Sequence, residues 1–366
     1  MSSLLIIAGG TGGHVFPALA IAHALRRQGV AVTWLGTRQG LEASVVPAAG
    51  IAIDWLTIRG LRRAGLWAWL LLPFRLTAAM WQSWHVLRRR RPDAVLAMGG
   101  FVAGPGGLVA WLRRTPLLIH EQNAVAGLTN RWLALIADVV MSGFPEAFGV
   151  LPGVRHVGNP VRAEILSLPA PQERLAGRGG RLRVLVIGGS RGAQVFNKVL
   201  PQTVALIKPE LRPELWHQAG RGQVASVERA YQAGGGAARV SEFIDDMAQA
   251  YAWADVIVCR AGAMTLAEVA AAGLAAILVP YPYAVDDHQT VNARFLTERD
   301  AAILLPESEF TPARVAELLA GFASQREVLV KMASHARACA MPDAADAAAQ
   351  LCVESMSRGP HGGVYA

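Results

Sequence analysis

Short apolar runs alternate with longer segments of helical apolar spacing along most of the chain. The runs read VAVTWLG, IAIDWL, DAVLAM, LLIHEQ and DVVMSG in the first half, and ELWHQAG, ARVSEFI, DVIVCR and AAILVP in the second. Continuous apolar runs of this length are typical of strands that are buried on both faces of a parallel sheet. The alternation therefore predicts an α/β protein in which helices connect parallel strands.

Two further apolar runs end in glycine-rich turns about half a chain apart. Residues 4–8 lead into GGTGGH (9–14), and residues 184–187 lead into GGSRGA (188–193). Helical spacing follows each turn, so the N–H groups of a helix start face an anion such as phosphate. Because doubly wound sheets bind ligands at the carboxyl ends of their strands, we predict two Rossmann-like doubly wound domains facing a cleft. Such an architecture suits group transfer.

The chain length and a break in the pattern indicate where the domains meet. A length of 366 residues favours two domains, each large enough to bury its own core. The segment GNPVR (158–162) interrupts the alternation, and a Pro- and Gly-rich stretch follows it. We expect a first domain at 1–160 and a second at 161–340, with a C-terminal helix at about 341–366 that packs back on the first domain.

Charge and cysteine content narrow the class of protein. Lys and Arg exceed Asp and Glu by 35 − 27 = 8, yet no nucleic-acid recognition motif is present, so we expect no nucleic-acid partner. The three cysteines lack metal-ligand spacing, which favours a reducing compartment and the cytoplasm. The apolar run at residues 4–8 is too short for a signal-peptide core and leads straight into the glycine turn.

One basic and apolar segment stands out in the first half. From residue 66 the chain reads LWAWLLLPFRLTAAMWQSW, flanked by Arg62 and Arg63 and by four arginines at 88–91. The uncharged run is too short to span a bilayer. Tryptophans with a basic rim are typical of a protein that binds the surface of an anionic membrane. The alternative is a buried hairpin that ends in a basic helix terminus.

Several nucleotide and metal sites are excluded by spacing. Neither glycine turn fits G-x-G-x-x-G, the strand ending TWLGT (33–37) lacks a carboxylate for ribose, and no P-loop frame occurs. Asp245-Asp246 and Asp286-Asp287 are adjacent rather than alternating, so the Asp-x-Asp metal motif is missing. We therefore expect no metal and no other cofactor. A departing diphosphate would depend on helix N-termini and on Arg162.

In the first half, three loops should meet at the carboxyl ends of strands: residues 9–14, 99–105 and 120–123. Asn123 and two candidates for a general base lie on them. A helix N-terminus favours the neutral imidazole of His14, the form that accepts a proton, and Glu121 competes for the same role. The alternative for His14 is a helix cap or a packed ring.

In the second half, Thr265 and Glu268 lie three residues apart on one face of an expected helix. The turn amides and Thr265 suit a phosphate, and Glu268 can accept hydrogen bonds from two ribose hydroxyls. A polar loop, Asp286-Asp287-His288-Gln289 with Asn292, follows the next strand. Read alone, the first of these motifs is only a helix start.

Seven ordered motifs give the chain a resemblance to a known family. GGTGGHVFPALAIA, MGGFVAGPGG, HEQNAVAGLTN, VGNPVR, GGSRGA, EFIDDM and CRAGAMTLAE resemble the MurG family from residue 3 to about 350. The resemblance implies a GT-B type fold and inverting transfer of N-acetylglucosamine from UDP-GlcNAc to undecaprenyl-diphosphate-linked N-acetylmuramoyl-pentapeptide. It also implies a β-1,4 link, a role in peptidoglycan synthesis, cell shape and division, and peripheral attachment to the cytoplasmic face of the inner membrane. It leaves room for other cell-wall synthesis proteins as partners.

The resemblance also implies the residues of the donor site. They are Thr11, Gly12, Gly13, Asn123, Arg162, Ser190, Ile244, Ala263, Met264, Thr265, Leu266, Ala267, Glu268 and Gln289. Ser190 and Thr265 would bind phosphate, Ile244 uracil, Glu268 ribose and Gln289 the sugar. The acceptor diphosphate would lie near His14, which makes His14 or Glu121 the base.

Three positions depart from the usual family pattern, and two other functions stay open. Arg191 replaces a glutamine, and Phe101 and Ala103 lack the hydroxyls often found there. A UDP-GlcNAc 2-epimerase on the same plan is the alternative enzyme, although it would need no apolar surface. A non-catalytic membrane-bound sensor of UDP-sugars is the alternative from another class.

Overall fold

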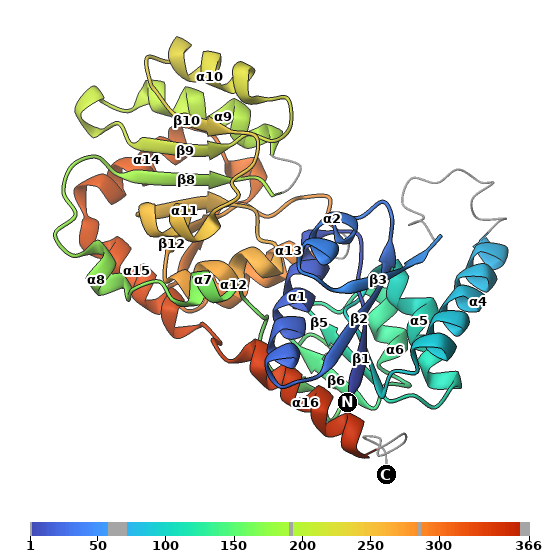
Figure 1. Ribbon diagram of the computed structural model, residues 1–366. Coiled ribbons are helices and arrows are strands. Elements are labelled where there is room, and N and C mark those ends of the chain that lie inside the picture. Colours follow the sequence, from blue (N-terminus) through green and yellow to red (C-terminus); the bar gives the residue numbers. More distant parts are fainter. Residues whose placement is uncertain (1, 58–71, 190–192, 285–286, 359–366) are drawn as a thin grey trace. The chain divides into compact units, whose positions relative to one another are not determined.

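A computed structural model describes residues 2–57, 72–189, 193–284 and 287–358, which form two compact units (Figure 1). Unit 1 comprises Met1–Arg162 and Met341–Ala366, and unit 2 comprises Ala163–Ala340. The chain thus leaves unit 1 two residues after the expected boundary. Each unit is built around one parallel sheet with helices, which confirms the predicted pair of Rossmann-like α/β folds.

The sheet of unit 1 has the order β3-β2-β1-β4-β5-β6-β7, with parallel pairing throughout. Because the order reverses between β1 and β4, a crevice for a ligand opens where these strands end. The strands are β1 (Ser3–Ile7), β2 (Ala31–Thr37), β3 (Ala52–Leu56), β4 (Ala94–Ala97), β5 (Leu117–Glu121), β6 (Val139–Ser142) and β7 (Arg155–His156). The two-residue β7 is too short for a pattern to predict.

Helices cover both faces of this sheet, as the continuous apolar strands require. Leu4 and Ile6 of β1 belong to a core shared with α1 and α16, whereas Leu5 and Ile7 belong to a core shared with α4 and α5. The C-terminal helix α16 packs against α1 (Figure 1). The helices are α1 (Gly12–Arg27), α2 (Glu42–Ala48), α4 (Leu72–Arg90), α5 (Gly100–Leu112), α6 (Leu128–Leu133) and α16 (Ala344–Arg358).

The sheet of unit 2 repeats this topology, with the order β10-β9-β8-β11-β12-β13 and parallel pairing. Its order reverses between β8 and β11, at the second glycine turn. The strands are β8 (Arg183–Ile187), β9 (Glu214–Gln218), β10 (Arg239–Ser241), β11 (Val256–Cys259), β12 (Ala275–Leu278) and β13 (Ala302–Leu304).

The helices of unit 2 also flank their sheet, and α9, α10 and α14 share a large apolar core with it. The α-helices are α7 (Ala163–Leu166), α8 (Pro171–Leu175), α9 (Gln194–Leu206), α10 (Val224–Ala233), α11 (Met247–Trp253), α12 (Ala263–Ala272), α13 (His288–Thr297), α14 (Pro312–Ser324) and α15 (Arg326–Ala338). Single 3-10 turns lie at Pro209–Leu211 and Glu307–Glu309.

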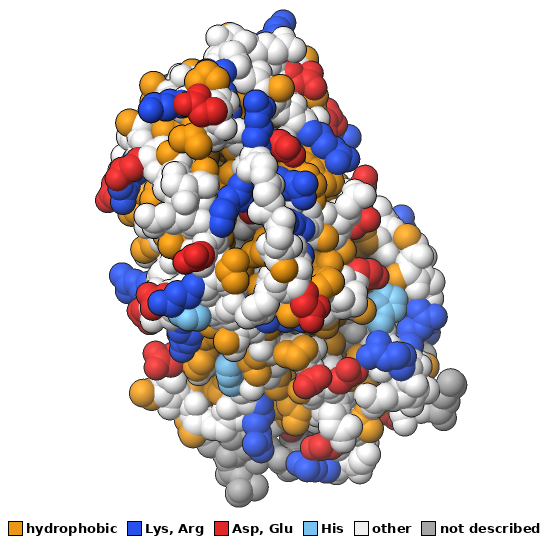
Figure 2. Space-filling view, turned by 90° about the vertical axis from the view of Figure 1, so that its left-hand side faces the viewer, with side chains coloured by type: hydrophobic (Ala, Val, Ile, Leu, Met, Phe, Trp, Pro, Cys, Tyr) orange, Lys and Arg blue, Asp and Glu red, His pale blue; other side chains and the backbone are white. Residues whose placement is uncertain are grey.

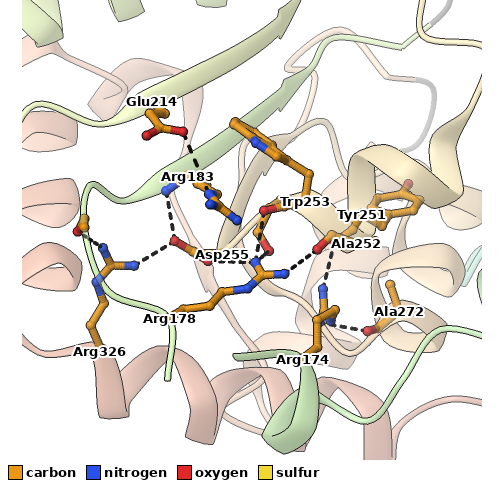
Figure 3. A network of polar contacts seen from close by, with 12 residues as sticks. Arg174, Arg178, Arg183, Glu214, Tyr251, Ala252, Trp253, Asp255, Ala272 and Arg326 are labelled. Carbon is orange, nitrogen blue, oxygen red and sulfur yellow. Dashed lines mark hydrogen bonds and ion pairs between the residues drawn. The ribbon is translucent and has the colours of Figure 1, made fainter. Parts of the chain in front are cut away.

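A buried carboxylate ties the entry segment of unit 2 to its sheet (Figure 3). Asp255, just before β11, accepts hydrogen bonds from Arg178 at 3.0 Å, from Arg326 at 2.7 Å and from the backbone N–H of Arg183 at 2.9 Å. Arg174 donates to the carbonyls of Tyr251 and Ala272, and burial lowers its pKa to about 10. These contacts fix α8 and the start of β8, and hence the strand that carries the second glycine turn.

Candidate functional site

The first glycine turn is held by a fully buried carboxylate. Gly10, with φ of +94°, donates its N–H to Oε2 of Glu42 at 2.9 Å. Oε1 of Glu42 accepts from the N–H and the hydroxyl of Thr37 at 2.8 and 2.7 Å. Sequence reasoning missed Glu42. The only signal in the sequence was weak: a single acidic residue two positions after Gly40. In the structure, a Cβ on Gly40 would collide with the carboxylate of Glu42.

The turn places His14 in the first turn of α1, next to the switch point of the sheet, where the strand order reverses between β1 and β4. Thr11 is the N-cap residue of α1 and makes no side-chain cap bond, and Gly12 and Gly13 are its first two residues. The helix start therefore presents backbone N–H groups without a side chain over them. A Cβ on Gly99 or Gly100 would lie 3.4 or 3.6 Å from the ring of His14, so the ring lies against the loop after β4.

Glu121 is committed to the loop that follows β5. It is 2% exposed, and Oε1 accepts from the backbone and side-chain N–H groups of Asn123 at 2.9 and 3.0 Å. Oε2 accepts from Gly127 at 3.1 Å and from Asn130 at 2.8 Å. Four N–H donors stabilise the carboxylate and use its acceptor capacity. This geometry favours His14 over Glu121 as the base. The hydrogen bonds of Glu121 instead stabilise the conformation of residues 122–130.

Arg162 lies at the end of unit 1. Its guanidinium stacks over the ring of Phe16, one helical turn into α1, with 5.4 Å between the guanidinium carbon and the ring centroid. The site residues predicted in the first half of the chain all belong to unit 1. Besides the glycine turn, they are His14, Glu121, Asn123 and Arg162.

In unit 2 a neutral side chain supports the second glycine turn. Gln218, at the end of β9, donates from Nε2 to the carbonyl of Gly189 at 3.2 Å, and Gly189 has φ of +81°. The expected phosphate ligand Ser190 and the family departure Arg191 lie outside the described residues.

The predicted ribose and phosphate residues share the start of α12. Gly262 is the N-cap, so Ala263, Met264 and Thr265 form the first turn, followed by Leu266, Ala267 and Glu268. Ala263 and Leu266 are buried, whereas Thr265 and Glu268 are half-buried. The hydroxyl of Tyr251 donates to Oε2 of Glu268 at 2.9 Å. Sequence reasoning missed Tyr251, because nothing in the spacing of residues 251 and 268 indicates the contact.

The polar loop predicted before Asn292 is wrong in one respect: α13 already begins at His288, so Gln289 and Asn292 are helical. Asp287 is the N-cap residue in a left-handed conformation, and its carboxylate accepts from the hydroxyl of Thr290 in the first turn at 2.7 Å. Gln289 accepts from the N–H of Tyr281 at 2.9 Å. Asn292 donates to the carbonyl of Ala261 at 3.1 Å and so ties α13 to the loop after β11.

The residue expected to contact uracil lies between β10 and α11. Ile244 is 3% exposed, and the segment turns at Asp246, which caps α11 by accepting from Gln249 at 2.8 Å. With its side chain buried, Ile244 could contact a ligand only through its backbone, and its proposed contact with uracil stays a prediction.

An apolar surface covers the described part of the tryptophan-rich segment. We define the α4–α5 patch as Phe74, Leu76, Trp81, Trp84, Trp111 and Leu112, all of them exposed. Helices α4 and α5 pack together, and Arg113 stacks over Trp84 at 4.7 Å. The buried-hairpin part of the alternative is therefore wrong for α4, because that helix buries one face and exposes the other, whereas the expected basic helix end is present at Arg88, Arg89 and Arg90. Trp67, Trp69 and the arginines at 62–63 lie outside the described residues.

The basic rim of this patch is partly neutralised. Arg89 and Arg90 both pair with Asp54 on β3, Arg90 at 2.8 Å.

On the face drawn in Figure 2, acidic, basic and hydrophobic side chains are interspersed, so the net positive charge is not gathered there. No described helix is both long and apolar enough to cross a membrane. Within the described ranges, no three His, Cys, Asp or Glu side chains cluster as a metal site would need.

Both halves of the chain match one enzyme family. Residues 4–142 match the glycosyltransferase family 28 N-terminal domain, and residues 183–350 match the C-terminal domain of that family. A Marinobacter nauticus protein named UDP-N-acetylglucosamine--N-acetylmuramyl-(pentapeptide) pyrophosphoryl-undecaprenol N-acetylglucosamine transferase is 51% identical, over 96% of this chain and 97% of its own. A protein of the same name from Alkalilimnicola ehrlichii is 53% identical, over 96% and 98%. The chain belongs to the MurG family of glycosyltransferases.

Solved structures agree with this assignment. The structure of Acinetobacter baumannii MurG is 39% identical to this chain, with a TM-score of 0.81 over 97% of this chain and all of that one. The structure of a UDP-GlcNAc 2-epimerase from Neisseria meningitidis has a TM-score of 0.67 at 13% identity, which shows a shared fold alone. Membership of the MurG family makes the epimerase the less favoured alternative.

Proposed function

We propose that this enzyme transfers N-acetylglucosamine from UDP-GlcNAc to the C4 hydroxyl of undecaprenyl-diphosphate-linked N-acetylmuramoyl-pentapeptide, with inversion to a β-1,4 link. The observation that carries the proposal is the match, at about half identity and over nearly the whole chain, to proteins named for this transfer. The two glycine turns at equivalent switch points support it, since one can hold each diphosphate.

The donor is proposed to bind unit 2. Glu268 accepts hydrogen bonds from ribose hydroxyls, Thr265 and the start of α12 hold the diphosphate, Gln289 contacts the sugar and the backbone at Ile244 contacts uracil. The half-buried carboxylate of Glu268, supported by Tyr251, suits this role because an ionised acceptor binds hydroxyl donors well. Ser190 is proposed as a further phosphate ligand.

The acceptor diphosphate is proposed to bind the glycine loops of unit 1. Five residues of the same unit are proposed as further donor-binding residues: Thr11, Gly12, Gly13, Asn123 and Arg162. His14 takes the proton of the acceptor hydroxyl, whose oxygen forms the new bond to the anomeric carbon. The bond from that carbon to the β-phosphate oxygen breaks, and UDP leaves with the electron pair. We propose that helix N-termini and Arg162 stabilise the leaving diphosphate and that no metal or other cofactor takes part.

We further propose that the α4–α5 patch binds the cytoplasmic surface of an anionic membrane, where the lipid acceptor resides. Exposed tryptophans next to arginines suit the interface between headgroups and acyl chains. The reaction would supply peptidoglycan precursor for cell shape and division, and contacts with other cell-wall synthesis proteins would occur at this membrane.

The test is transfer of labelled N-acetylglucosamine from UDP-GlcNAc to a short-chain prenyl-diphosphate N-acetylmuramoyl-pentapeptide. Reactions run with and without chelator, beside an acceptor-free control. Label in the lipid product that persists with chelator is the expected result. Conversion of the donor to its 2-epimer would replace the transferase by the epimerase, and donor binding without any conversion would replace it by the sensor.

A further inference from the structure

A chain of three polar side chains runs inward from the proposed base. Nδ1 of His14 lies 2.8 Å from Oε1 of Gln122, and Nε2 of Gln122 lies 3.0 Å from Nδ1 of His120. Nε2 of His120 lies 3.0 Å from the carbonyl oxygen of Gly158. Gln122 is 1% exposed and His120 is fully buried, so water does not compete for these groups.

The direction of each hydrogen bond follows from the inner end. The carbonyl of Gly158 can only accept, so Nε2 of His120 carries the hydrogen. Neutral His120 then has an acceptor at Nδ1. The amide nitrogen of Gln122 faces two acceptors, this Nδ1 and the carbonyl of His120 at 3.1 Å, which fixes the orientation of the amide.

The outer end is thereby determined as well. Because the amide nitrogen of Gln122 points inward, its oxygen faces Nδ1 of His14 and can only accept. Nδ1 of His14 must carry the hydrogen, and Nε2 keeps the lone pair. The backbone carbonyl of Gln122 accepts from the side-chain amide of Asn159 at 2.9 Å, which also holds the residue in place.

Neutrality of His120 is required, since a second hydrogen at Nδ1 would face the amide hydrogens of Gln122. Burial lowers the pKa of His120 to about 4, against the weaker opposing effects of the Gly158 carbonyl and of Glu121. His14 and His156 also disfavour a charge on it. At neutral pH the inner histidine is therefore an uncharged donor to the carbonyl and an acceptor from the amide.

We propose that Gln122 and His120 are positioning residues that hold neutral His14 as its Nδ1–H tautomer and so aim the Nε2 lone pair at the acceptor hydroxyl. This inference rests on the proposed role of His14 as the base. The Nδ1–H form is the minor tautomer of free histidine, so the chain selects the form that catalysis uses. Gly100, with φ of +76°, lies beside Nε2 of His14, and a Cβ built on it would be 3.8 Å from that nitrogen.

The proton transfer balances without any change in the inner chain. The O–H bond of the acceptor breaks as the Nε2–H bond of His14 forms, and the positive charge stays on His14. An amide oxygen has no basicity comparable to a carboxylate, so Gln122 continues to accept from Nδ1–H and no second proton moves. This arrangement orients the base without a charged partner.

The direct test is the 15N spectrum of the histidine rings in the full-length enzyme at a pH where His14 is neutral, with His14→Ala used to assign the signal. We expect a protonated Nδ1 and an unprotonated Nε2. In Gln122→Met, which keeps the length of the side chain but cannot accept, we expect a mixture of tautomers. An Nε2–H tautomer for His14 in the wild-type spectrum would overturn the proposal without any variant.

Kinetics separate positioning from mere structural support. Loss of an oriented hydrogen bond to a base should lower kcat at least about tenfold in Gln122→Met while the Kd for UDP-GlcNAc stays unchanged. Ser142→Ala is the matched control, since it removes one buried hydroxyl on the neighbouring strand β6. Equal kcat values for Gln122→Met and wild type would also overturn the proposal. Failure of the proposed function looks different: the wild type transfers no label, or His14→Ala keeps its turnover, whatever the tautomer.

Discussion

The two switch points share strand order and a glycine turn but differ in what supports them. In unit 1 the turn is braced by the buried carboxylate of Glu42, and the proposed base is backed by the buried pair Gln122 and His120. In unit 2 the turn is braced by the amide of Gln218, and the proposed ligands Thr265 and Glu268 are half-buried. The same topology thus surrounds the proposed base of unit 1 with buried polar side chains, whereas the proposed donor ligands of unit 2 lie at a partly exposed helix start.

The largest effect should come from the base itself. His14→Ala should lower kcat by about 10²- to 10⁴-fold, the usual range for general base catalysis, with the Kd of UDP-GlcNAc within a factor of about three. Steady-state kinetics and donor titration measure the two. His23→Ala, an exposed histidine on the same helix, is the control. Unchanged turnover in His14→Ala would show that His14 is not the base, and the proposed difference between the two switch points would then be wrong.

The support that Glu42 gives to the glycine turn of unit 1 can be tested by measuring stability. Glu42→Ala leaves the N–H groups of Gly10 and Thr37 without their acceptor, so it should destabilise unit 1 by about 3 kcal/mol. Hydrogen exchange resolved by unit is the measurement, because a two-unit chain need not unfold in one step. Glu146→Ala, on an exposed turn of the same unit, should change little. Equal protection in both variants would show that the turn holds without Glu42.

Among the described residues, each unit contains one buried histidine, which allows the two units to be compared by pH. Burial lowers the pKa of both His120 and His217 to about 4. The unfolded chain binds protons at these sites below about pH 6.5 and the folded chain does not, so stability is complete above that pH and falls toward pH 4, by up to about 3 kcal/mol per histidine.

Hydrogen exchange between pH 7 and 4.5, converted to opening free energies, follows this loss in each unit. His217→Gln should weaken the dependence of the opening free energy on pH in unit 2 and leave that dependence unchanged in unit 1. The reason is that His217 forms its hydrogen bond within unit 2, with Tyr231 at 2.9 Å. The interpretation is wrong if the dependence weakens in both units, or in neither.

The sequence anticipated the fold closely because the strands are buried on both faces and therefore appear as continuous apolar runs. It also placed both glycine turns after strands and His14, Thr265 and Glu268 on the helices that follow strands, since glycines and polar residues at strand ends are local signals. It did not anticipate Glu42, Tyr251 or the role of Glu121. Those depend on contacts between residues that are distant in sequence or on the burial of a charge, and neither leaves a periodic trace. The helical start at His288 was missed although Asp287, a residue type common at helix N-caps, stands directly before it.

On the binding side of the comparison, loss of the proposed ribose ligand should weaken the donor rather than the chemistry. Glu268→Ala removes a charged acceptor, so the Kd of UDP-GlcNAc should rise about tenfold to hundredfold while kcat at saturation changes far less. Isothermal titration gives the Kd. Glu317→Ala, an exposed glutamate on α14, should bind as wild type does. A kcat loss with an unchanged Kd would place Glu268 in the chemistry instead.

The smallest effect sharpens the same contrast, because unit 2 has its own supporting side chain. Tyr251→Phe removes one donor from Glu268 without changing the packing of the ring. Because Glu268 itself stays in place to bind the ribose, the Kd of UDP-GlcNAc should rise only about fivefold. Tyr231→Phe makes the identical change at His217, away from the start of α12, and controls for the loss of a buried hydroxyl. If both variants weaken donor binding equally, Tyr251 acts on the stability of unit 2 and not on Glu268. If only Tyr251→Phe does so, each switch point has its own positioning group: one that sets a tautomer in unit 1, and one that orients a carboxylate in unit 2.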